Sequence, residues 1–491
     1  MVSTPFIAIC ALLAVIVVKT LVTVFQRARG PLSYLPGPWY TVYTSKALLY
    51  YWIQGERTTY VERLHEKYGP VVRLSPSEVD FSSISGAKKI HRFRQPFLKA
   101  SFYEAFQGHL NVSESVFSTR DSDFHALHRR LLSGPISKSS LKSVEPIVKA
   151  RVELAIQKMA AEAKSRGCMD VLKWWLFMAT DIIGELSFGD SFRMLEIGKK
   201  NQYAEDLGKV ASMAGIRLSF PVLLKIASRL PFNIPLFKES ADSMTRILRY
   251  AEESLQRHKN IVEADPVNAK PTLFKNLYKA GEEGMSDREI AAEARAYIVA
   301  GSDTTAHSLT YMVWAVCKDA TIKQRLVEEV SRLPEYFSDE DLESLPYMNN
   351  VIRETLRLYA AAPGALPRTV PSGGSDIDGY WLPGGLTVTT QAWSLHRDGS
   401  VFPDPYTFNP SRWENATKDM HDAWMPFGGG PRNCIGLHLA MMELRLATAS
   451  FFRKFTNASV SSREGFTDDD MAPKAYLLVY PKGKRCLIDG S

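Results

Sequence analysis

Cys434 lies in the segment FGGGPRNCIG (residues 427–436), where three glycines, a proline and an arginine precede it and another glycine follows it closely. A cysteine thiolate is a strong ligand for soft or borderline metal ions. Structural zinc usually takes four protein ligands, but the five cysteines, at positions 10, 168, 317, 434 and 486, are far apart in the sequence. A single axial thiolate is enough for a haem iron. The residue types around Cys434 therefore favour a haem-thiolate centre.

The residues beside Cys434 suit a flat, anionic ligand. Glycine loses more backbone freedom on folding than any other residue, so we interpret Gly428, Gly429 and Gly430 as positions where the backbone passes close to a macrocycle. Arg432 is expected to bind a propionate through charge-assisted hydrogen bonds. Backbone N–H groups near the sulfur, and the start of a helix after it, would stabilise the thiolate. The alternative is an inert, buried cysteine that follows a flexible loop.

The segment matches the pattern F-x-x-G-x-R-x-C-x-G at all five fixed positions. It resembles the haem-binding loop of the cytochrome P450 superfamily. The resemblance implies haem b, iron protoporphyrin IX, with the Cys434 thiolate as the axial iron ligand. It also implies haem-binding roles for four further residues of the loop: Phe427, Gly428, Arg432 and Gly436.

A second motif of the same family is the segment ETLR, in which Glu354 and Arg357 share one helix face. Such a pair is most often a solvated ion pair. The segment FNPSRW follows, and its Arg412 stands where an arginine completes the Glu–Arg–Arg cluster of the family. Ser411 replaces the usual glutamate and Trp413 an often-found phenylalanine, and we expect neither change to touch the cluster. By resemblance, the cluster has a structural role.

A third motif, AGSDTT (residues 300–305), interrupts a long apolar helical stretch that opens with a capping box of Ser286 and Glu289. Its polar residues are poor helix formers. By resemblance, Gly301 leaves space for dioxygen beside the haem, and Asp303 and Thr304 are the acid–alcohol pair that delivers protons. The alternative is a helix bent by serine and threonine, with no chemistry.

Haem propionates require cations. His125 and Arg129 resemble the W/H-x-x-x-R helix of the family, and Arg368 stands where an arginine that binds a propionate is usual. Solvated surface charge is the competing interpretation for each of them. A basic face for a redox partner is expected from three further side chains: His128, Arg130 and Lys138.

Substrate contacts are expected in three aromatic or apolar segments and at one position of the long helix. The substrate would accordingly be apolar and of medium size, and core packing is the alternative role for these residues. The candidates are Phe97, Phe102, Tyr103, Phe106, Met213, Phe220, Tyr297, Gly364, Ala365 and Leu366.

The amino terminus carries an apolar run from Phe6 to Phe25, with Lys19 as its one charged residue. About 20 apolar residues span a bilayer, and Arg27 and Arg29 after the run favour a cytosolic body. We expect a single-pass transmembrane anchor with its basic flank (residues 1–30), followed by one catalytic domain (residues 31–491) that faces the cytosol at the endoplasmic reticulum membrane. A buried core helix is the alternative.

The whole chain has 491 residues, of which 45% are hydrophobic and 23% charged, and its net charge is +7. This charge is too small to indicate nucleic-acid binding, but it suits an acidic protein partner or an anionic membrane. Helical periodicity is clear at residues 143–165 and 322–333, and strand patterns occur at residues 69–76, 379–391 and 475–483. The expected fold is mainly α with small β-sheets, the cytochrome P450 fold: a single large haem-binding domain behind the anchor.

The resemblance implies a haem-thiolate monooxygenase that oxidises an apolar small molecule with O2. No flavin or dinucleotide fingerprint is present, so electrons would come from NADPH through a separate reductase, with cytochrome b5 as a further candidate donor. The motif styles are similar to those of filamentous fungi, which suggests terpenoid or polyketide secondary metabolism. Two alternatives remain: an oxygen-independent haem-thiolate isomerase or dehydratase, which usually lacks the acid–alcohol pair, and a non-catalytic haem-binding protein.

Overall fold

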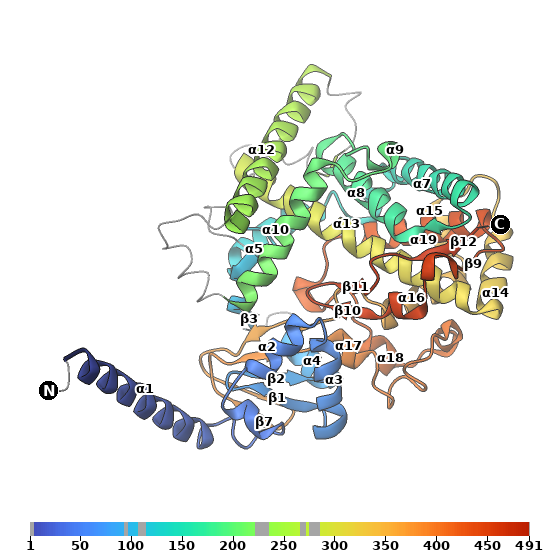
Figure 1. The fold of residues 1–491 in the computed structure, drawn as a ribbon. Helices are drawn as coiled ribbons and strands as arrows, with labels where there is room; N and C mark the ends of the chain where they lie inside the picture. The colour runs from blue at the N-terminus through green and yellow to red at the C-terminus, as the bar shows by residue number, and fades with distance from the viewer. Residues whose placement is uncertain are drawn as a thin grey trace.

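The computed structural model describes residues 4–92, 97–106, 114–220, 235–265, 272–273 and 285–490. The chain is mainly helical, with several small sheets, as the sequence predicts. The long helices α7, α8, α13 and α19 gather in one part of the molecule, and the strands β1 and β2 lie beside the short helices α2, α3 and α4 in another (Figure 1).

The elements of the first half of the chain are α1 (Thr4–Ala28), η1 (Trp39–Val42), α2 (Lys46–Ile53), α3 (Arg57–Tyr68), β1 (Val71–Ser75), β2 (Glu78–Phe81), α4 (Ile84–His91), β3 (Leu98–Lys99), η2 (Ser101–Phe106), α5 (Ser122–Ser133), α6 (Lys138–Leu141), α7 (Glu145–Arg166), β4 (Met169–Asp170), α8 (Val171–Phe188), α9 (Met194–Ile197), α10 (Gln202–Ser219) and α12 (Pro235–Ala264). The second half contains α13 (Asp287–Lys318), α14 (Ala320–Ser331), α15 (Asp339–Glu343), α16 (Pro346–Leu358), β5 (Arg368–Thr369), β6 (Ser375–Ile377), β7 (Tyr380–Leu382), β8 (Thr387–Thr389), α17 (Ala392–Leu395), η5 (Pro410–Asn415), α18 (Lys418–Ala423), η6 (Gly430–Arg432), α19 (Leu437–Lys454), β9 (Ser459–Val460), η7 (Arg463–Gly465), η8 (Asp468–Met471), β10 (Pro473–Ala475), β11 (Val479–Pro481) and β12 (Leu487–Asp489).

The centre of the core is the packing of α13 against α8. Most side chains of α8 are buried on every side of the helix, which is typical of a helix inside a large domain. The predicted capping box starts α13: Ser286 Oγ accepts from the N–H of Glu289, and the Glu289 carboxylate accepts from the N–H of Ser286. A Cβ at Gly301 would lie 3.1 Å from Ile183 of α8. Gly301 therefore lets the two helices approach closely.

The largest sheet has the strand order β1-β2-β8-β5-β3. β1 pairs antiparallel with β2, β2 parallel with β8, and β5 antiparallel with both β8 and β3. Strands from three distant parts of the sequence thus form one sheet. The register places Lys99 of β3 directly opposite Arg368 of β5, which brings two cations to the same sheet edge.

The amino-terminal helix α1 projects away from the rest of the molecule (Figure 1). Several of its apolar side chains are exposed, including Leu13, Val17 and Leu21. A search of the described residues finds no helix with the length and apolar character needed to cross a bilayer. The structure therefore does not show the predicted transmembrane span.

A fully buried carboxylate, that of Glu354, joins α16 to η5. Arg357 donates to both of its oxygens, at 2.9 and 2.8 Å, and Arg412 donates to Oε1 at 3.0 Å. The indole N–H of Trp413 donates to Oε2 at 3.0 Å. Our expectation that Trp413 does not touch the cluster is therefore wrong, because this N–H satisfies an acceptor that a phenylalanine would leave open.

We predict that Glu354→Gln lowers the free energy of unfolding by about 3–5 kcal/mol, because it leaves the buried Arg357 without its counter-charge. Urea unfolding followed by circular dichroism measures the change. Glu340→Gln is the matched control, since Glu340 pairs with Lys142 at 2.8 Å on the surface and exposed pairs contribute little. Equal losses in the two variants would contradict the structural role of Glu354.

Candidate active site

The loop that carries Cys434 is held by backbone contacts. Gly428 and Gly430 have φ of 73° and 65°, in the left-handed region that favours glycine. A Cβ at Gly430 would lie 1.7 Å from the carbonyl oxygen of His91, at the end of α4. The N–H of Cys434 donates to the carbonyl of Phe427 at 2.8 Å. The glycines thus allow the loop to turn tightly and to rest against α4.

The Cys434 side chain is exposed in the structure, and desolvation raises the pKa of its thiol. The backbone N–H of Gly436 and the charge of Arg129 act in the opposite direction and lower the pKa. Gly436 is also the N-cap of α19, whose amino terminus favours negative charge. The surroundings therefore offer a thiolate both a hydrogen bond and positive potential.

Cationic side chains from four elements gather near Cys434. Lys99 and Arg368 are register partners on β3 and β5, Arg129 lies on α5, and Arg432 ends η6. Like charges directly opposite each other destabilise a sheet. Burial and the charges of Arg368 and Arg432 lower the pKa of Lys99. Among the described residues, none of these four cations forms an ion pair with a carboxylate within 4.0 Å. The charges of Glu293 and Asp121 act on Lys99 and Arg432 without such a close pair.

Each arginine of the cluster is oriented by neutral acceptors. Arg129 donates to the backbone carbonyl and the side-chain oxygen of Asn433, both at 2.7 Å. Arg432 donates to the carbonyl of Thr119 at 2.9 Å, and Arg368 donates to the Tyr103 hydroxyl at 3.3 Å. These contacts orient the guanidinium groups without neutralising them.

The predicted His125 is buried next to this cluster. Desolvation, together with the charges of Arg432, Lys99, Arg129 and Arg368, lowers its pKa to about 3. His125 is therefore neutral at physiological pH. An anion that bound among the four cations would remove part of the repulsion.

These observations fit the cofactor that the sequence predicts. A dianionic ligand would supply the missing counter-charge to Lys99, Arg129, Arg368 and Arg432. The Cys434 side chain is exposed and has a thiolate-stabilising N–H at Gly436. The glycine loop has a backbone that accepts no side chain at Gly430. The residues present are therefore suited to hold the propionates and the iron of a haem.

One face of α13 is turned toward Cys434. This face carries three residues spaced by three and four positions: Tyr297, Ala300 and Thr304. The charge of Arg129 lowers the pKa of Tyr297 and that of Cys434 raises it, so Tyr297 lies close to both. The Thr304 hydroxyl donates to the carbonyl of Ala300 at 2.6 Å. This face places the predicted alcohol on the side of the cysteine.

The predicted acid lies on a neighbouring face of the same helix. The carboxylate of Asp303 accepts from the hydroxyl of Tyr480, on β11, at 3.1 Å. Gly301 points toward Ile183 of α8, so the structure gives this glycine a role in helix packing. The space for dioxygen that we expect at Gly301 stays a prediction.

The structure separates the substrate candidates into several groups. Phe97 is buried in the core cluster of the five-stranded sheet with Val79 and Phe81, and its contact with substrate stays a prediction. Tyr103, on η2, is buried, and η2 contacts α10, which carries Met213. Phe102 and Phe106 are edge-to-face neighbours on η2, and Phe220, which is 38% exposed, directly follows α10.

The remaining candidates lie near the cysteine loop and α13. Leu366 approaches Gly428, where a Cβ would contact its side chain at 3.7 Å. A Cβ at Gly364 would lie 3.9 Å from the carbonyl oxygen of Tyr476, in the turn between β10 and β11. Ala365 bridges to Gln391. The segment 364–366 is thus placed between the cysteine loop and the β10–β11 hairpin, and its contact with substrate stays a prediction.

Some residues of the site carry too weak a sequence signal to be singled out. Lys99 is an isolated lysine in an aromatic segment, and only its pairing with Arg368 shows its proximity to the cation cluster. Tyr480 lies 177 residues from Asp303 in the sequence. Glu443, on α19, is buried and hydrogen-bonded to Thr305, and desolvation raises its pKa to about 8. A charged residue inside the apolar pattern of α19 is the signal that could have identified it.

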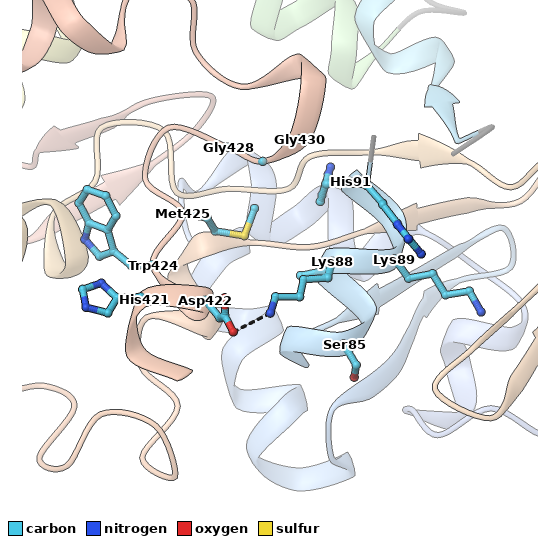
Figure 2. A pocket seen from close by; sticks show the side chains of 13 residues that line it. Ser85, Lys88, Lys89, His91, His421, Asp422, Trp424, Met425, Gly428 and Gly430 are labelled. Carbon is cyan, nitrogen blue, oxygen red and sulfur yellow. Dashed lines mark ion pairs between the residues drawn. The ribbon is translucent and has the colours of Figure 1, made fainter. Parts of the chain in front are cut away.

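A cleft of about 800 Å³ lies next to the glycines of the cysteine loop. Figure 2 shows it between α4 and the segment that follows α18, with Lys88 paired to Asp422 at 2.6 Å. Its lining residues are Ser85, Ala87, Lys88, Lys89, His91, Arg92, His421, Asp422, Trp424, Met425, Gly428, Gly429 and Gly430. The cleft is therefore basic on its α4 side and reaches the backbone of the cysteine loop.

Two of the side chains expected on a basic face are engaged within the molecule. His128 is buried, and its ring nitrogens lie 3.5 Å from Glu289 and 3.8 Å from Glu293. Lys138 pairs with Glu343 at 2.6 Å. The prediction of a basic face is therefore wrong for His128, because burial removes it from the surface.

Comparison with known proteins agrees with this geometry. The family model for cytochrome P450 matches residues 35–484. The chain is similar to the cytochrome P450 monooxygenase tazI of Aspergillus terreus, with 50% identity over 482 residues, which cover 98% of each chain. It is also similar to the cytochrome P450 monooxygenase orf2 of Aspergillus niger, with 41% identity over 469 residues (95% of this chain and 94% of the relative).

The chain belongs to the cytochrome P450 family. The family and the shared description of these fungal relatives identify it as a monooxygenase, an oxidoreductase that incorporates oxygen. The predictions of family and enzyme class are confirmed.

We predict that Gly430→Ala lowers the free energy of unfolding by more than about 3 kcal/mol and reduces haem retention, because the new Cβ would collide with the carbonyl of His91. Thermal unfolding and the ratio of haem to protein absorbance measure the two effects. Gly428→Ala is the matched control: its φ is also positive, but its Cβ has space, so we expect a loss of only about 1–2 kcal/mol. A Gly430→Ala protein as stable as Gly428→Ala would contradict the contact with α4.

Proposed function

We propose that this cytochrome P450 oxidises an apolar small molecule in secondary metabolism, with haem b bound at Cys434, O2 as co-substrate and electrons from NADPH delivered by a separate reductase. One observation carries the proposal: an exposed cysteine side chain lies next to four cations that form no ion pair among the described residues. A haem fills both requirements at once, because it has an iron that binds thiolate and two anionic propionates.

The bound haem would supply oxygen activation. The residues of the chain would hold it and control protons around it. Cys434 would ligate the iron, with the N–H of Gly436 and the charge of Arg129 stabilising the thiolate. Thr304 would present its hydroxyl on the face of α13 that is turned toward the cysteine, and Asp303 would exchange protons with solvent from the adjacent face.

The substrate would lie between η2, α10 and the segment 364–366. The aromatic rings of Phe102, Tyr103 and Phe106 and the apolar side chains of Met213 and Leu366 favour an apolar ligand. Terpenoid and polyketide skeletons have this character, and cytochrome P450s of filamentous fungi commonly modify such compounds. The names of the relatives given above do not state a substrate, so the class rests on the lining residues.

The reductase would dock at the cleft beside the cysteine loop. Lys88, Lys89 and Arg92 lie on its α4 side, and a positive surface suits an acidic partner. His91, the last residue of α4, touches the backbone of Gly430, so a partner in the cleft would be close to the haem loop. Cytochrome b5, which is also acidic, would compete for the same surface.

The amino-terminal helix α1 would attach the protein to the endoplasmic reticulum membrane, with the catalytic domain facing the cytosol. Its exposed apolar side chains, among them Leu13, Val17 and Leu21, support this proposal, as do the cationic residues Arg27 and Arg29 that follow the apolar run.

We predict that Cys434→Ser abolishes the red-shifted carbonyl absorption of the reduced, carbon-monoxide-bound protein, because a serine oxygen does not replace the thiolate. The measurement is a reduced carbon-monoxide difference spectrum of purified full-length protein. Cys317→Ala, which removes a thiol from α13, should keep the absorption. If the absorption persists in Cys434→Ser, the proposed haem ligand is wrong.

We also predict that Thr304→Ala diverts reducing equivalents to hydrogen peroxide, since a hydroxyl that serves proton delivery is lost. Peroxide release per NADPH consumed, with purified reductase, should rise several-fold. Thr310→Ala is the control. The Thr310 hydroxyl lies on the same helix and also donates to the carbonyl four residues earlier, so its loss should change peroxide release per NADPH little. Unchanged peroxide release in Thr304→Ala would favour an oxygen-independent isomerase or dehydratase.

A further inference from the structure

Among the described residues, the side chain of Asp303 has one hydrogen-bond partner, and that partner comes from the far end of the chain. Tyr480 Oη lies 3.1 Å from Asp303 Oδ2 and donates to it. Burial and the charge of Asp303 raise the pKa of Tyr480, so the hydroxyl keeps its proton and remains a donor. Among the described residues no basic side chain lies within ion-pair distance of Asp303. The phenol is therefore the group that holds this carboxylate.

The backbone that carries Tyr480 is fixed on both sides. In the β10–β11 hairpin, Lys474 is the register partner of Tyr480. The N–H of Val479 donates to the carbonyl of Ala361, and the N–H of Ala475 donates to the carbonyl of Gly55, each at 2.8 Å. Because both strands of the hairpin are held by these two hydrogen bonds, the phenol of Tyr480 has little freedom to move. Its hydroxyl therefore defines a fixed position for the carboxylate.

His307, one turn after Asp303 on α13, completes the surroundings of the phenol. Its ring packs edge-on against Tyr480, with 4.5 Å between ring centroids. Burial lowers the pKa of His307, so the ring is neutral, and its Nδ1 has no hydrogen-bond partner among the described residues. His307 therefore limits the position of the Tyr480 ring without forming an ion pair with Asp303.

We infer that Tyr480 is a positioning residue that holds the carboxylate of Asp303 where it can pass protons toward Thr304. Consecutive helix residues point about 100° apart, so Asp303 reaches the face of Thr304 only in a restricted set of side-chain conformations. A hydrogen bond to a fixed donor selects one of them. This inference rests on the proposed function, in which Asp303 and Thr304 deliver protons.

The test compares Tyr480→Phe with Tyr311→Phe in the full-length protein reconstituted with purified reductase and no added organic substrate. One NADPH and one proton reduce O2 to hydrogen peroxide, whereas two NADPH and two protons reduce O2 to two waters. Tyr311 is the matched control, because it is a buried tyrosine of the same region whose hydroxyl has no partner among the described residues. In Tyr480→Phe the ratio of water to peroxide should fall by a factor of about 2 to 10, the range for loss of one hydrogen bond; in Tyr311→Phe it should not change.

Asp303→Asn separates failure of this inference from failure of the proposed function. If Asp303→Asn leaves the ratio of water to peroxide at the wild-type value, Asp303 does not deliver protons and both proposals are wrong. If Asp303→Asn lowers the ratio but Tyr480→Phe does not, only the present inference is overturned. When both variants lower it, Tyr480→Phe added to Asp303→Asn should have no further effect, since the two act through one contact. Additive losses would overturn the inference.

A second readout does not depend on turnover. Infrared spectra of protein labelled with 13C-aspartate contain a carboxylate band of Asp303, which is assigned by its loss in Asp303→Asn. This band should shift in Tyr480→Phe, because the hydrogen bond is lost, and should stay in place in Tyr311→Phe. An unshifted band in Tyr480→Phe would show that the contact does not exist in solution and would overturn the inference.

Discussion

Repulsion among the cations beside Cys434 is the physical constraint on which the site depends. Lys99 and Arg368 face each other across two paired strands, and Arg432 lies close enough for its charge to lower the pKa of Lys99. Such an arrangement costs free energy unless negative charge is added. A dianion bound among them would therefore stabilise the edge of the sheet that carries Lys99 and Arg368, and ligand binding would be coupled to local folding.

The scaffold holds this site from two directions. On one side, α13 packs against α8 closely enough that Gly301 has room for no larger side chain without displacing Ile183. On the other, the buried Glu354 joins α16 to η5, in the part of the chain that leads to the cysteine loop. Both are contacts between segments that are distant in sequence. The face of α13 with Tyr297 and Thr304 is thus fixed relative to the sulfur by packing that does not itself involve the haem.

The sequence predicts the parts of the site that consist of local patterns. The cysteine loop, the Glu354–Arg357 pair and the capping box at Ser286 each depend on spacing within a few residues. The mainly helical architecture with small sheets, the family and the capping box are confirmed. Contacts that depend on strand register or on chain ends could not be predicted. Lys99 has no motif around it and enters the site only because β3 pairs with β5. We expect Trp413 not to touch the cluster, because the family pattern states only which residue type is usual at each position. The hydrogen bond from its indole N–H to Glu354 depends on where one atom lies in the fold.

The contact between Asp303 and Tyr480 also joins two regions that have different roles. The turn of the β10–β11 hairpin passes next to Gly364, in the segment proposed to contact substrate, and β11 of the same hairpin holds the carboxylate of Asp303. Backbone hydrogen bonds to Gly55 and Ala361 hold the two strands of this hairpin in place. The hairpin therefore connects the segment proposed to contact substrate with the carboxylate of Asp303 through one fixed side chain, that of Tyr480.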